Sequence, residues 1–385
     1  MSRRWCLPLA AAATIAFAAP ASAHHGIDVD VIAKKLDNPR HVAVAKDGDV
    51  YVAESGRGGN HATAKSCFDS AEGFACTGRT GAITRIGRWG QERVVKGLAS
   101  FAPVGGNNAI GPHGVYVDGR DVYFTNGGPT GPTRGAPPGV LVLRDPTLVK
   151  EDPISALYGR LFRVKSRDRI VPIADAWAFE NRFNPDAQVG NPIVDSNPVD
   201  VLVDHGRYVM ADAGGNSVIR TDHRGRLEAL SVFPNIPKPH PFIPGAIVPM
   251  QAVPTGVVEG PDGFYYVSQL TGFPFPAGEA SVFRVNPRTG AYTVYATGFT
   301  MAMDLDFGDD GTLYVLELDS DNILGGSTDG SIWTVSKRGV KRKLALPAGT
   351  LTEPGGIAAG RHDKLYVSNR SRSAGIGEVL RIDLD

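Results

Sequence analysis

A strand–turn–strand motif recurs six times along this 385-residue chain, and this repetition constrains the fold more than any other feature. Each copy is an apolar segment, a Gly/Asp turn and an aromatic, β-branched segment that ends in Glu, Asp, Asn or Gln. A third apolar segment follows each copy, and a more polar fourth segment follows the earlier ones. The copies begin at Asn38, Gly111, Asn197, Val253, Met301 and Glu353. Four strands repeated in this way form one blade, so the chain is predicted to be an all-β, six-bladed β-propeller with four strands per blade.

The two ends of the repeat predict how the ring closes. The last copy lacks a fourth strand because the chain stops at Asp385, whereas an additional strand over Ile27–Leu36 precedes the first copy. We expect this strand to pair with Gly377–Leu384 and complete the last blade, because that pairing removes two open sheet edges. Residues 24–385 are therefore expected to form a single propeller domain.

The N-terminus has the pattern of a signal peptide over residues 1–23. Arg3 and Arg4 precede an apolar stretch over Leu7–Ala19, and the small residues 21–23 form an A-x-A cleavage site. We therefore expect a secreted or periplasmic protein; a retained N-terminal anchor is the alternative. No other stretch approaches the ~18 apolar residues that a membrane span needs, so no membrane span is expected.

Composition narrows the partners and the redox environment. Forty basic and forty acidic residues cancel, which argues against nucleic acid as a partner. Cys6 leaves with the signal peptide, and the remaining pair, Cys67 and Cys76, is expected to form a disulfide in an oxidising compartment. Metal binding by these two cysteines is the alternative.

The long connections are all predicted to lie on one face of the ring, which we call the decorated face. They belong to the loops after strands two and four of the blades, and the main insertions cover about 56–80, 127–156, 179–197 and 233–251. Loops on one side of a rigid scaffold commonly carry function. We therefore expect a monomer that binds a small molecule, a glycan or a protein through this face; neutral variation in loop length is the alternative.

Acidic and amide residues recur where the second strands end. They are Glu54, Asn126, Asp212, Gln269, Glu317 and Asn369. Such a ring of oxygen atoms suits Ca²⁺, so Glu54, Asp212 and Glu317 are candidate ligands at the channel rim. The alternative is that each side chain caps the following turn through backbone N–H groups.

A second set of polar residues breaks the six-fold repetition. At the third position of the inner strand, blades one, three and five carry His41, Asp200 and Asp304, whereas the other three blades carry glycine. One imidazole and two carboxylates suit a metal site or acid/base chemistry at the rim. Hydrogen bonding between blades is the alternative, and His113 is a further candidate.

The motifs resemble two groups of known proteins. The repeat P-x-G-V-x-V…Y-V is similar to the NHL-type propeller repeat, and the whole chain resembles the ScyD/ScyE family of exported propellers. The resemblance rests on the segment 36–56, on IGPHGVYV and SNPVDVLV, on the segment 253–285 and on GEVLRIDL, and the stretch Gln269–Gly278 is its most particular part. It implies a six-bladed propeller and export, and it assigns no reaction.

Two functional hypotheses follow. The first is a binding module that uses the decorated face, and the second is a metal-dependent hydrolase or lactonase of the Ca²⁺ type with its site at the channel mouth. Calcium-dependent lactonases are also six-bladed propellers, with acidic and amide ligands near the start of the inner strands. This chain has no carboxylate at the second inner-strand position, where Arg40, Val199 and Met303 stand, and that departure weakens the second hypothesis.

Overall fold

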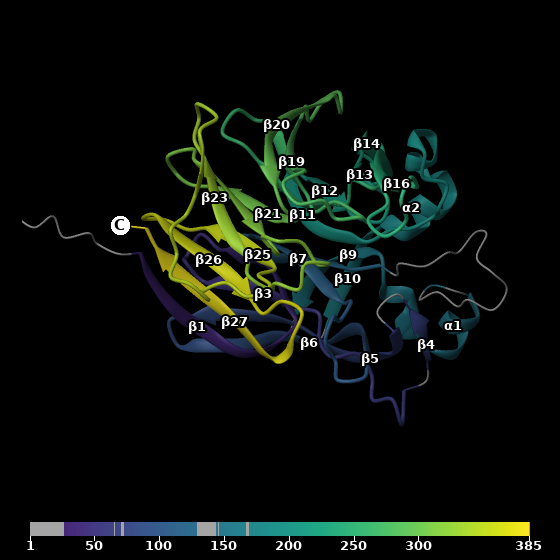
Figure 1. Ribbon diagram of the computed structural model, residues 1–385. Coiled ribbons are helices and arrows are strands. Elements are labelled where there is room, and N and C mark those ends of the chain that lie inside the picture. The colour runs from purple at the N-terminus through teal and green to yellow at the C-terminus, as the bar shows by residue number, and fades with distance from the viewer. Residues whose placement is uncertain are drawn as a thin grey trace, which may run out of the picture.

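The computed structural model describes residues 27–64, 66–70, 73–128, 144, 146–166 and 169–384. The proposed signal peptide and much of the 127–156 insertion lie outside the described residues. Six antiparallel sheets of four strands surround a common axis, with one additional short strand in blade one (Figure 1). The six-bladed β-propeller is therefore confirmed.

The first three blades share one strand order from the axis outward. Blade one is β2 (Pro39–Val44), β3 (Val50–Glu54), β5 (Gly73–Gly87) and β6 (Gly90–Pro103). Blade two is β7 (Pro112–Asp118), β8 (Asp121–Asn126), β9 (Arg160–Ser166) and β10 (Arg169–Asp175). Blade three is β11 (Pro198–Asp204), β12 (Arg207–Asp212), β13 (Ser217–Thr221) and β14 (Leu227–Val232).

The second half of the ring repeats the same order. Blade four is β17 (Pro254–Glu259), β18 (Tyr265–Gln269), β19 (Ala280–Val285) and β20 (Tyr292–Phe299). Blade five is β21 (Ala302–Phe307), β22 (Leu313–Glu317), β23 (Ser331–Val335) and β24 (Lys341–Lys343). Blade six is β25 (Gly356–Ala359), β26 (Lys364–Asn369), β27 (Ala374–Asp383) and β1 (Asp28–Asp37).

The N-terminal strand closes the ring as predicted. β1 runs antiparallel to β27, with Val31 opposite Leu380 and Leu36 opposite Gly377. In Figure 1 the purple β1 therefore lies beside the yellow β27, although the two strands are at opposite ends of the chain. This pairing covers the edge of β27, which would be exposed if blade six had only its other three strands.

The core lies between neighbouring blades. Each sheet packs its apolar face on the next, and one cluster, for example, joins Val209 and Val218 of blade three to Val257 and Val267 of blade four. The strands supply alternating apolar residues, which is why the same periodicity that predicted the strands also builds these interfaces. Burial of each large aliphatic side chain contributes about 1.5–3 kcal/mol.

The longer connections add further elements outside the blades. They contain β4 (Cys67–Ser70), α1 (Pro146–Glu151), the 3₁₀ helix η1 (Pro153–Leu157), α2 (Ala176–Phe183), the 3₁₀ helix η2 (Pro185–Val189), and the hairpin of β15 (Ile236–Pro239) and β16 (Ile247–Met250). All of them lie in connections that follow the second or the fourth strand of a blade. These connections leave the blades at the end where the inner strands begin, because successive strands are antiparallel.

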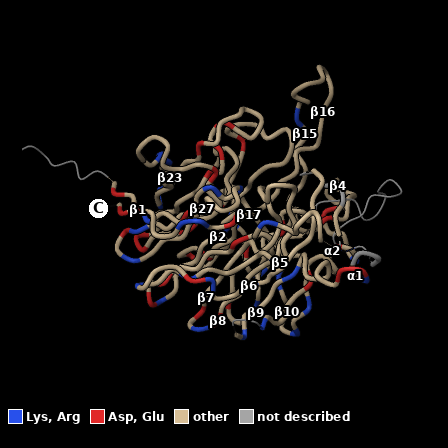
Figure 2. Tube along the Cα trace, turned by 90° about the horizontal axis from the view of Figure 1, so that it is seen from below, with Lys and Arg blue, Asp and Glu red and all other residues tan. Residues whose placement is uncertain are grey.

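The disulfide is also confirmed. Cys67 of β4 is directly opposite Cys76 of β5, and their sulfur atoms are bonded. Cys76 is fully buried, so the bridge ties the inserted strand to the extended edge of blade one. Acidic and basic residues are interspersed over the described chain, in keeping with the balanced composition (Figure 2).

Candidate functional site

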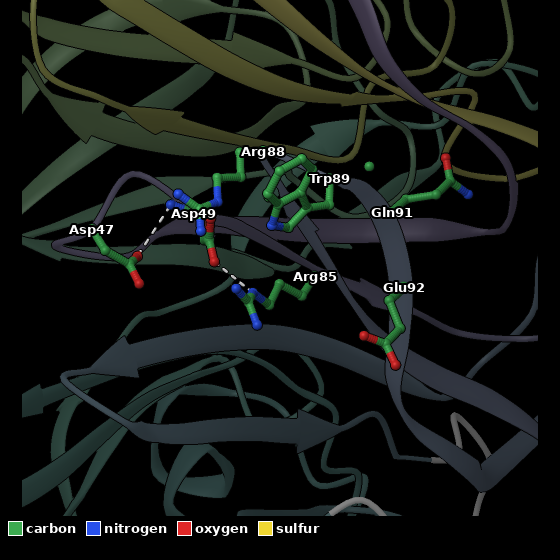
Figure 3. Close-up of a pocket in the computed structure, with 9 residues that line it drawn as sticks. Asp47, Asp49, Arg85, Arg88, Trp89, Gln91 and Glu92 are labelled. Carbon is green, nitrogen blue, oxygen red and sulfur yellow. Dashed lines mark hydrogen bonds and ion pairs between the residues drawn. The ribbon is translucent and has the colours of Figure 1, made fainter.

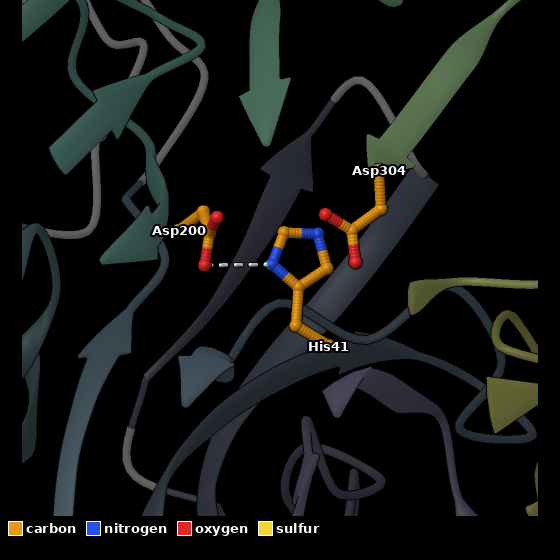
Figure 4. Close-up of side chains that lie close together, drawn as sticks. All are labelled: His41, Asp200 and Asp304. Carbon is orange, nitrogen blue, oxygen red and sulfur yellow. Dashed lines mark ion pairs between the residues drawn. The ribbon is translucent and has the colours of Figure 1, made fainter. Parts of the chain in front are cut away.

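Three polar side chains from alternate blades meet on the axis of the ring. His41, Asp200 and Asp304 occupy the third position of β2, β11 and β21, and only 1%, 8% and 4% of their surface is exposed. One ligand atom from each lies within 4.8 Å of the other two. His41 Nδ1 lies 3.1 Å from Asp200 Oδ1, and Figure 4 shows the imidazole between the two carboxylates.

Glycine at the same position of the other three blades makes this convergence geometrically feasible. These glycines are Gly114, Gly256 and Gly356. A Cβ atom there would lie 2.6 Å from Asp200 Cα, 2.7 Å from Asp304 Oδ1 and 2.5 Å from His41 Cα, respectively. All three distances are below normal contact, so only glycine fits at these positions beside the strands that carry the three polar residues.

The two carboxylates also join neighbouring blades. Each accepts a hydrogen bond from the next amide of its own strand and another from an amide of the following blade, all at 2.8 Å. The amides in the following blades belong to Val257, which bonds Asp200, and to Ile357, which bonds Asp304. The expected alternative of hydrogen bonding between blades is therefore observed, and each carboxylate oxygen keeps a further lone pair for a ligand.

The cluster has strongly perturbed electrostatics. Burial alone would lower the pKa of His41, but the negative charges of Asp304 and Asp200 outweigh it and raise that pKa to about 9. Burial and the neighbouring Asp200 charge raise the pKa of Asp304 to about 7, although His41 opposes this shift. His41 Nε2 is buried and has no hydrogen-bond partner in the part of the chain that the structure describes. In the absence of a ligand, a proton on His41 thus compensates the carboxylates.

A cavity of about 260 Å³ leads from this cluster to solvent. Its lining begins at His41, Asp200 and Asp304 and continues toward the ends of the inner strands, as far as Lys46 and Asp306. None of the lining residues comes earlier in its inner strand than the position of these three polar residues. The Lys46 side chain is 83% exposed, so the cavity opens at the face opposite the insertions.

This geometry corrects the predicted position of the three residues at the rim of the decorated face. A third strand position lies about 7 Å inside the strand start, because each residue advances the strand by roughly 3.3 Å. Met301, Met303 and Leu318 are buried and pack with Leu270 and Phe275 at the side of the decorated face. The polar cluster is therefore inside the channel and is reached from the other end.

His113 lies next to the cluster but is not one of the residues whose ligand atoms converge. Its ring stands edge-on to that of His41, with centroids 5.4 Å apart, and its Nδ1 lies 3.0 Å from the carbonyl oxygen of Val199. Burial and the positive charges of Arg40 and His41 hold the pKa of His113 well below its usual value. A neutral His113 that donates its Nδ1 proton to Val199 fixes the position of the His41 ring.

The acidic residues that end the second strands make backbone contacts. Glu54, Asp212 and Glu317 are buried, with 0%, 1% and 2% exposure. Each accepts a hydrogen bond from a backbone amide that comes shortly before the inner strand of its own blade. The donors are the amides of Asp37, Asn197 and Thr300, at 2.7, 2.7 and 2.6 Å. Glu54 also pairs with Arg93. These contacts hold the connection that leads into each inner strand, which differs from the expected capping of the following turn. Asp212 also accepts a hydrogen bond at 3.1 Å from the amide of Gly215 in the turn that follows it.

The sequence motifs did not single out two features of the opposite face. Asp306 lines the axial cavity, and its carboxylate bonds the amide of Ala359 as Asp304 bonds that of Ile357. The D-x-D spacing in β21 is the signal that would have found it. A shallow groove beside blade one holds Trp89, 88% exposed, with Arg88 over its ring and Asp49 paired with Arg85 (Figure 3).

No helix among the described residues is long and apolar enough to cross a membrane. No protein-family profile and no curated protein sequence matches the chain.

Several solved structures share the architecture. A putative gluconolactonase aligns with a TM-score of 0.50 and 12% identity over 93% of this chain and 92% of its own. A catalytically inactive virginiamycin B lyase from Staphylococcus aureus with quinupristin gives 0.47 and 13% over 93% and 100%. A putative glucose dehydrogenase from Thermus thermophilus gives 0.49 and 16% over 93% and 100%. At these identities the likeness to the gluconolactonase shows the propeller fold alone.

Proposed function

We propose that the protein is an exported propeller whose axial cavity binds a small ligand through a divalent metal ion held by His41, Asp200 and Asp304. The observation that carries this proposal is the convergence of one imidazole and two carboxylates, all buried, at the closed end of a cavity that reaches solvent. Inner strands of three different blades supply these groups, and a rigid scaffold of this kind holds ligand geometry closely.

The donor set favours a transition-metal ion over calcium. Imidazole nitrogen is a good ligand for Zn²⁺, Mn²⁺ or Fe²⁺, whereas Ca²⁺ prefers six to eight oxygen atoms. His41 Nε2 is buried without a partner, and such a nitrogen is stabilised by a metal ion as well as by a proton. The neutral His113, bonded to Val199, keeps the neighbouring ring in place.

The wider identity of the protein belongs to the same proposal. It includes a single domain over 24–385 and a monomeric state. Export by a signal peptide over residues 1–23 is supported by the leader pattern and the Cys67–Cys76 disulfide, and membership of the ScyD/ScyE family is supported by the Gln269–Gly278 motif.

A metal-dependent hydrolase or lactonase is the second candidate function. The observation that favours it is the 260 Å³ of space directly beside the cluster, which accommodates a water molecule together with a small ester or lactone. A divalent metal ion supplies Lewis acidity and lowers the pKa of bound water. In this case His41, Asp200 and Asp304 position the ion, and the lining of the cavity positions the substrate.

The decorated face remains a proposed surface for a protein or glycan partner. The β15–β16 hairpin projects from the ring (Figure 2) and exposes Ile236, Phe242, Ile243 and Ile247 to between 43% and 70%. Phe233, at the base of this insertion, instead stacks on Phe283 with ring centroids 4.5 Å apart and is buried. A loop-deletion variant that replaces 236–250 with a short glycine linker tests partner capture without touching the axial cavity.

The axial proposal is tested by metal content and by matched variants. We expect the purified mature protein to hold close to one equivalent of Zn²⁺, Mn²⁺ or Fe²⁺, and Asp304→Asn to lose it. Asp306→Asn is the control, because Asp306 makes the same kind of hydrogen bond to the next blade but is not one of the residues whose ligand atoms converge with His41. Wild-type protein without stoichiometric metal, and without affinity for added metal, would refute the proposal. Turnover of a lactone and ester panel separates the hydrolase from the binding module.

A further inference from the structure

A second group of acidic side chains lies beneath the insertion that connects blades two and three. Glu180 belongs to α2, Asp186 belongs to η2, and Asp212 ends β12 of blade three. These residues are 1%, 0% and 1% exposed. The insertion folds back on blade three, and α2 and η2 both contact β14 (Figure 1).

Glu180 and Asp212 approach the turn between β12 and β13, and Asp186 is hydrogen-bonded to Asn216 of the same turn. Glu180 Oε2 and Asp212 Cγ both lie within 3.5 Å of the point that a Cβ atom at Gly215 would occupy. Asp186 Oδ2 accepts hydrogen bonds from the side-chain amides of Asn191 and Asn216, at 2.6 and 2.9 Å. The absence of a side chain at Gly215 thus leaves space that the acids face.

Two oxygen atoms in this group are buried and have no hydrogen-bond donor among the described residues. They are Glu180 Oε1 and Asp186 Oδ1. Within the described part of the chain, Glu180, Asp186 and Asp212 form no ion pair with Lys, Arg or His. A buried carboxylate without compensation costs several kcal/mol, so a native protein normally supplies a cation or a proton at such a place.

We propose that Glu180 and Asp186, with the charge of Asp212 behind them, bind a hard divalent cation with the chemistry of Ca²⁺. The two atoms without a partner are carboxylate oxygens, and oxygen ligands are the preference of Ca²⁺ and not of the transition metals that favour imidazole. The ion would tie the α2–η2 insertion to blade three. This site is separate from the axial cluster, and the inference goes beyond the function proposed above.

Protonation is the competing way to neutralise the same group. Burial, together with the charges of Asp212 and Asp186, raises the pKa of Glu180 to about 9, and burial raises that of Asp186 to about 6. A chain without the cation therefore carries a proton on Glu180 at neutral pH. Calcium added at constant pH should change the Tm if a cation neutralises the group, and should leave it unchanged if protons do.

The experiment uses the full mature protein at pH 7.5. We expect calcium loading followed by gel filtration to leave about one equivalent of Ca²⁺, and EGTA to lower the Tm until CaCl₂ is restored. Glu180→Gln keeps the size of the side chain and resembles the protonated acid. We expect it to weaken calcium binding at least tenfold and to abolish the Tm difference between EGTA and CaCl₂.

Two further variants make the result unambiguous. Asp186→Asn is expected to behave as Glu180→Gln does, whereas Asp304→Asn in the axial cluster is expected to keep the calcium response. Loss of that response in Asp304→Asn alone would move calcium to the axis and overturn the inference. A wild-type protein that retains no calcium and has the same Tm in EGTA and CaCl₂ would also overturn it, and would assign protons to the group. Neither outcome affects the transition-metal test of the axial site.

Discussion

Replacement of Gly356 by alanine tests whether close packing of inner strands positions the axial cluster. Gly356 is the first residue of β25, beside β2 of blade one. A Cβ atom there would lie 2.5 Å from His41 Cα and 3.0 Å from both Arg40 O and Val42 N. All three atoms belong to backbone, so no side-chain rotation relieves the contact. The backbone of Gly356 is not in the left-handed region, and the cost is therefore purely steric.

The size of the effect follows from the displacement that is required. Carbon atoms pack at about 3.5–4.0 Å, so β25 and β2 must separate by roughly 1 Å. Overpacking of a well-filled core costs about 1–3 kcal/mol, and we expect the upper end because two strands must move. His41 moves with β2, away from Asp200 and Asp304. Affinity for the axial metal ion should fall at least tenfold, equivalent to about 1.4 kcal/mol.

The assay pairs urea denaturation with metal titration. Gly308→Ala is the matched control, because the nearest atoms to its added methyl are side-chain ends, Tyr314 Cε2 at 3.1 Å and Asp310 Oδ1 at 3.3 Å, which can rotate away. We expect the control to unfold within about 1 kcal/mol of wild type. If Gly356→Ala unfolds at the same urea concentration as Gly308→Ala and binds metal as tightly as wild type, the close approach of β25 and β2 does not position His41.

Three further outcomes are expected. Removal of β1 (Asp28–Asp37) exposes the edge of β27 and deletes the fully buried Leu36, so size-exclusion chromatography should show aggregation in place of the wild-type elution peak. Reduction of the Cys67–Cys76 bridge, which joins residues nine apart, should lower the free energy of unfolding by about 2–3 kcal/mol in denaturant, and the double serine variant should not respond to reductant. In metal-free protein, the pKa of His41 is about 9 when folded against 6.5 unfolded, so its stabilisation is complete below pH 6.5 and is lost as pH rises through 9. That loss is about 3 kcal/mol, and His41→Gln should flatten it in urea titrations across this range.

The sequence predicted the strands and the ring because both depend on local, repeated patterns. The repeated apolar segments of β11 and β12 can be recognised directly in the sequence, and the fourth strand that blade six lacks after β27 is matched by the additional β1 strand. Pairing of strands so distant in the chain was predictable only because six copies of one motif define a closed ring.

The depth of the axial cluster was not predictable in the same way. Repetition places His41, Asp200 and Asp304 at one level of the ring, and their glycine counterparts show that the axis is crowded. Which end of the channel is closed depends on how Leu270 and Phe275 pack on Met303, a contact between a loop and a neighbouring blade that no periodicity encodes. The sequence therefore predicted that these three residues lie at the rim, whereas in the structure they lie inside the channel.

The Glu180 group was missed for a related reason. Asp212 occupies the repeated position at the end of a second strand, but Glu180 and Asp186 stand 32 and 26 residues before it in an insertion with no counterpart in other blades, so the repeat gives these two residues no register. In the sequence, Glu180 is an acidic residue in a short helical segment, and a solvent-exposed position is the ordinary expectation for such a residue. Only the return of α2 and η2 onto blade three removes water from Glu180 and Asp186.

The two proposed cation sites differ in the part of the fold that builds them, and this has a testable consequence. The axial donors stand on inner strands whose spacing is set by backbone contacts at Gly114, Gly256 and Gly356, so the cluster should persist whether or not an ion is present. The oxygen donors of Glu180 and Asp186 stand on short helices, which depend on a counter-charge to stay packed on blade three. Hydrogen exchange in EGTA should therefore accelerate over α2 and η2 while the inner strands remain protected. Equal acceleration in both regions would mean that the insertion and the blades unfold together, and the proposed division between scaffold and ion-dependent insertion would be wrong.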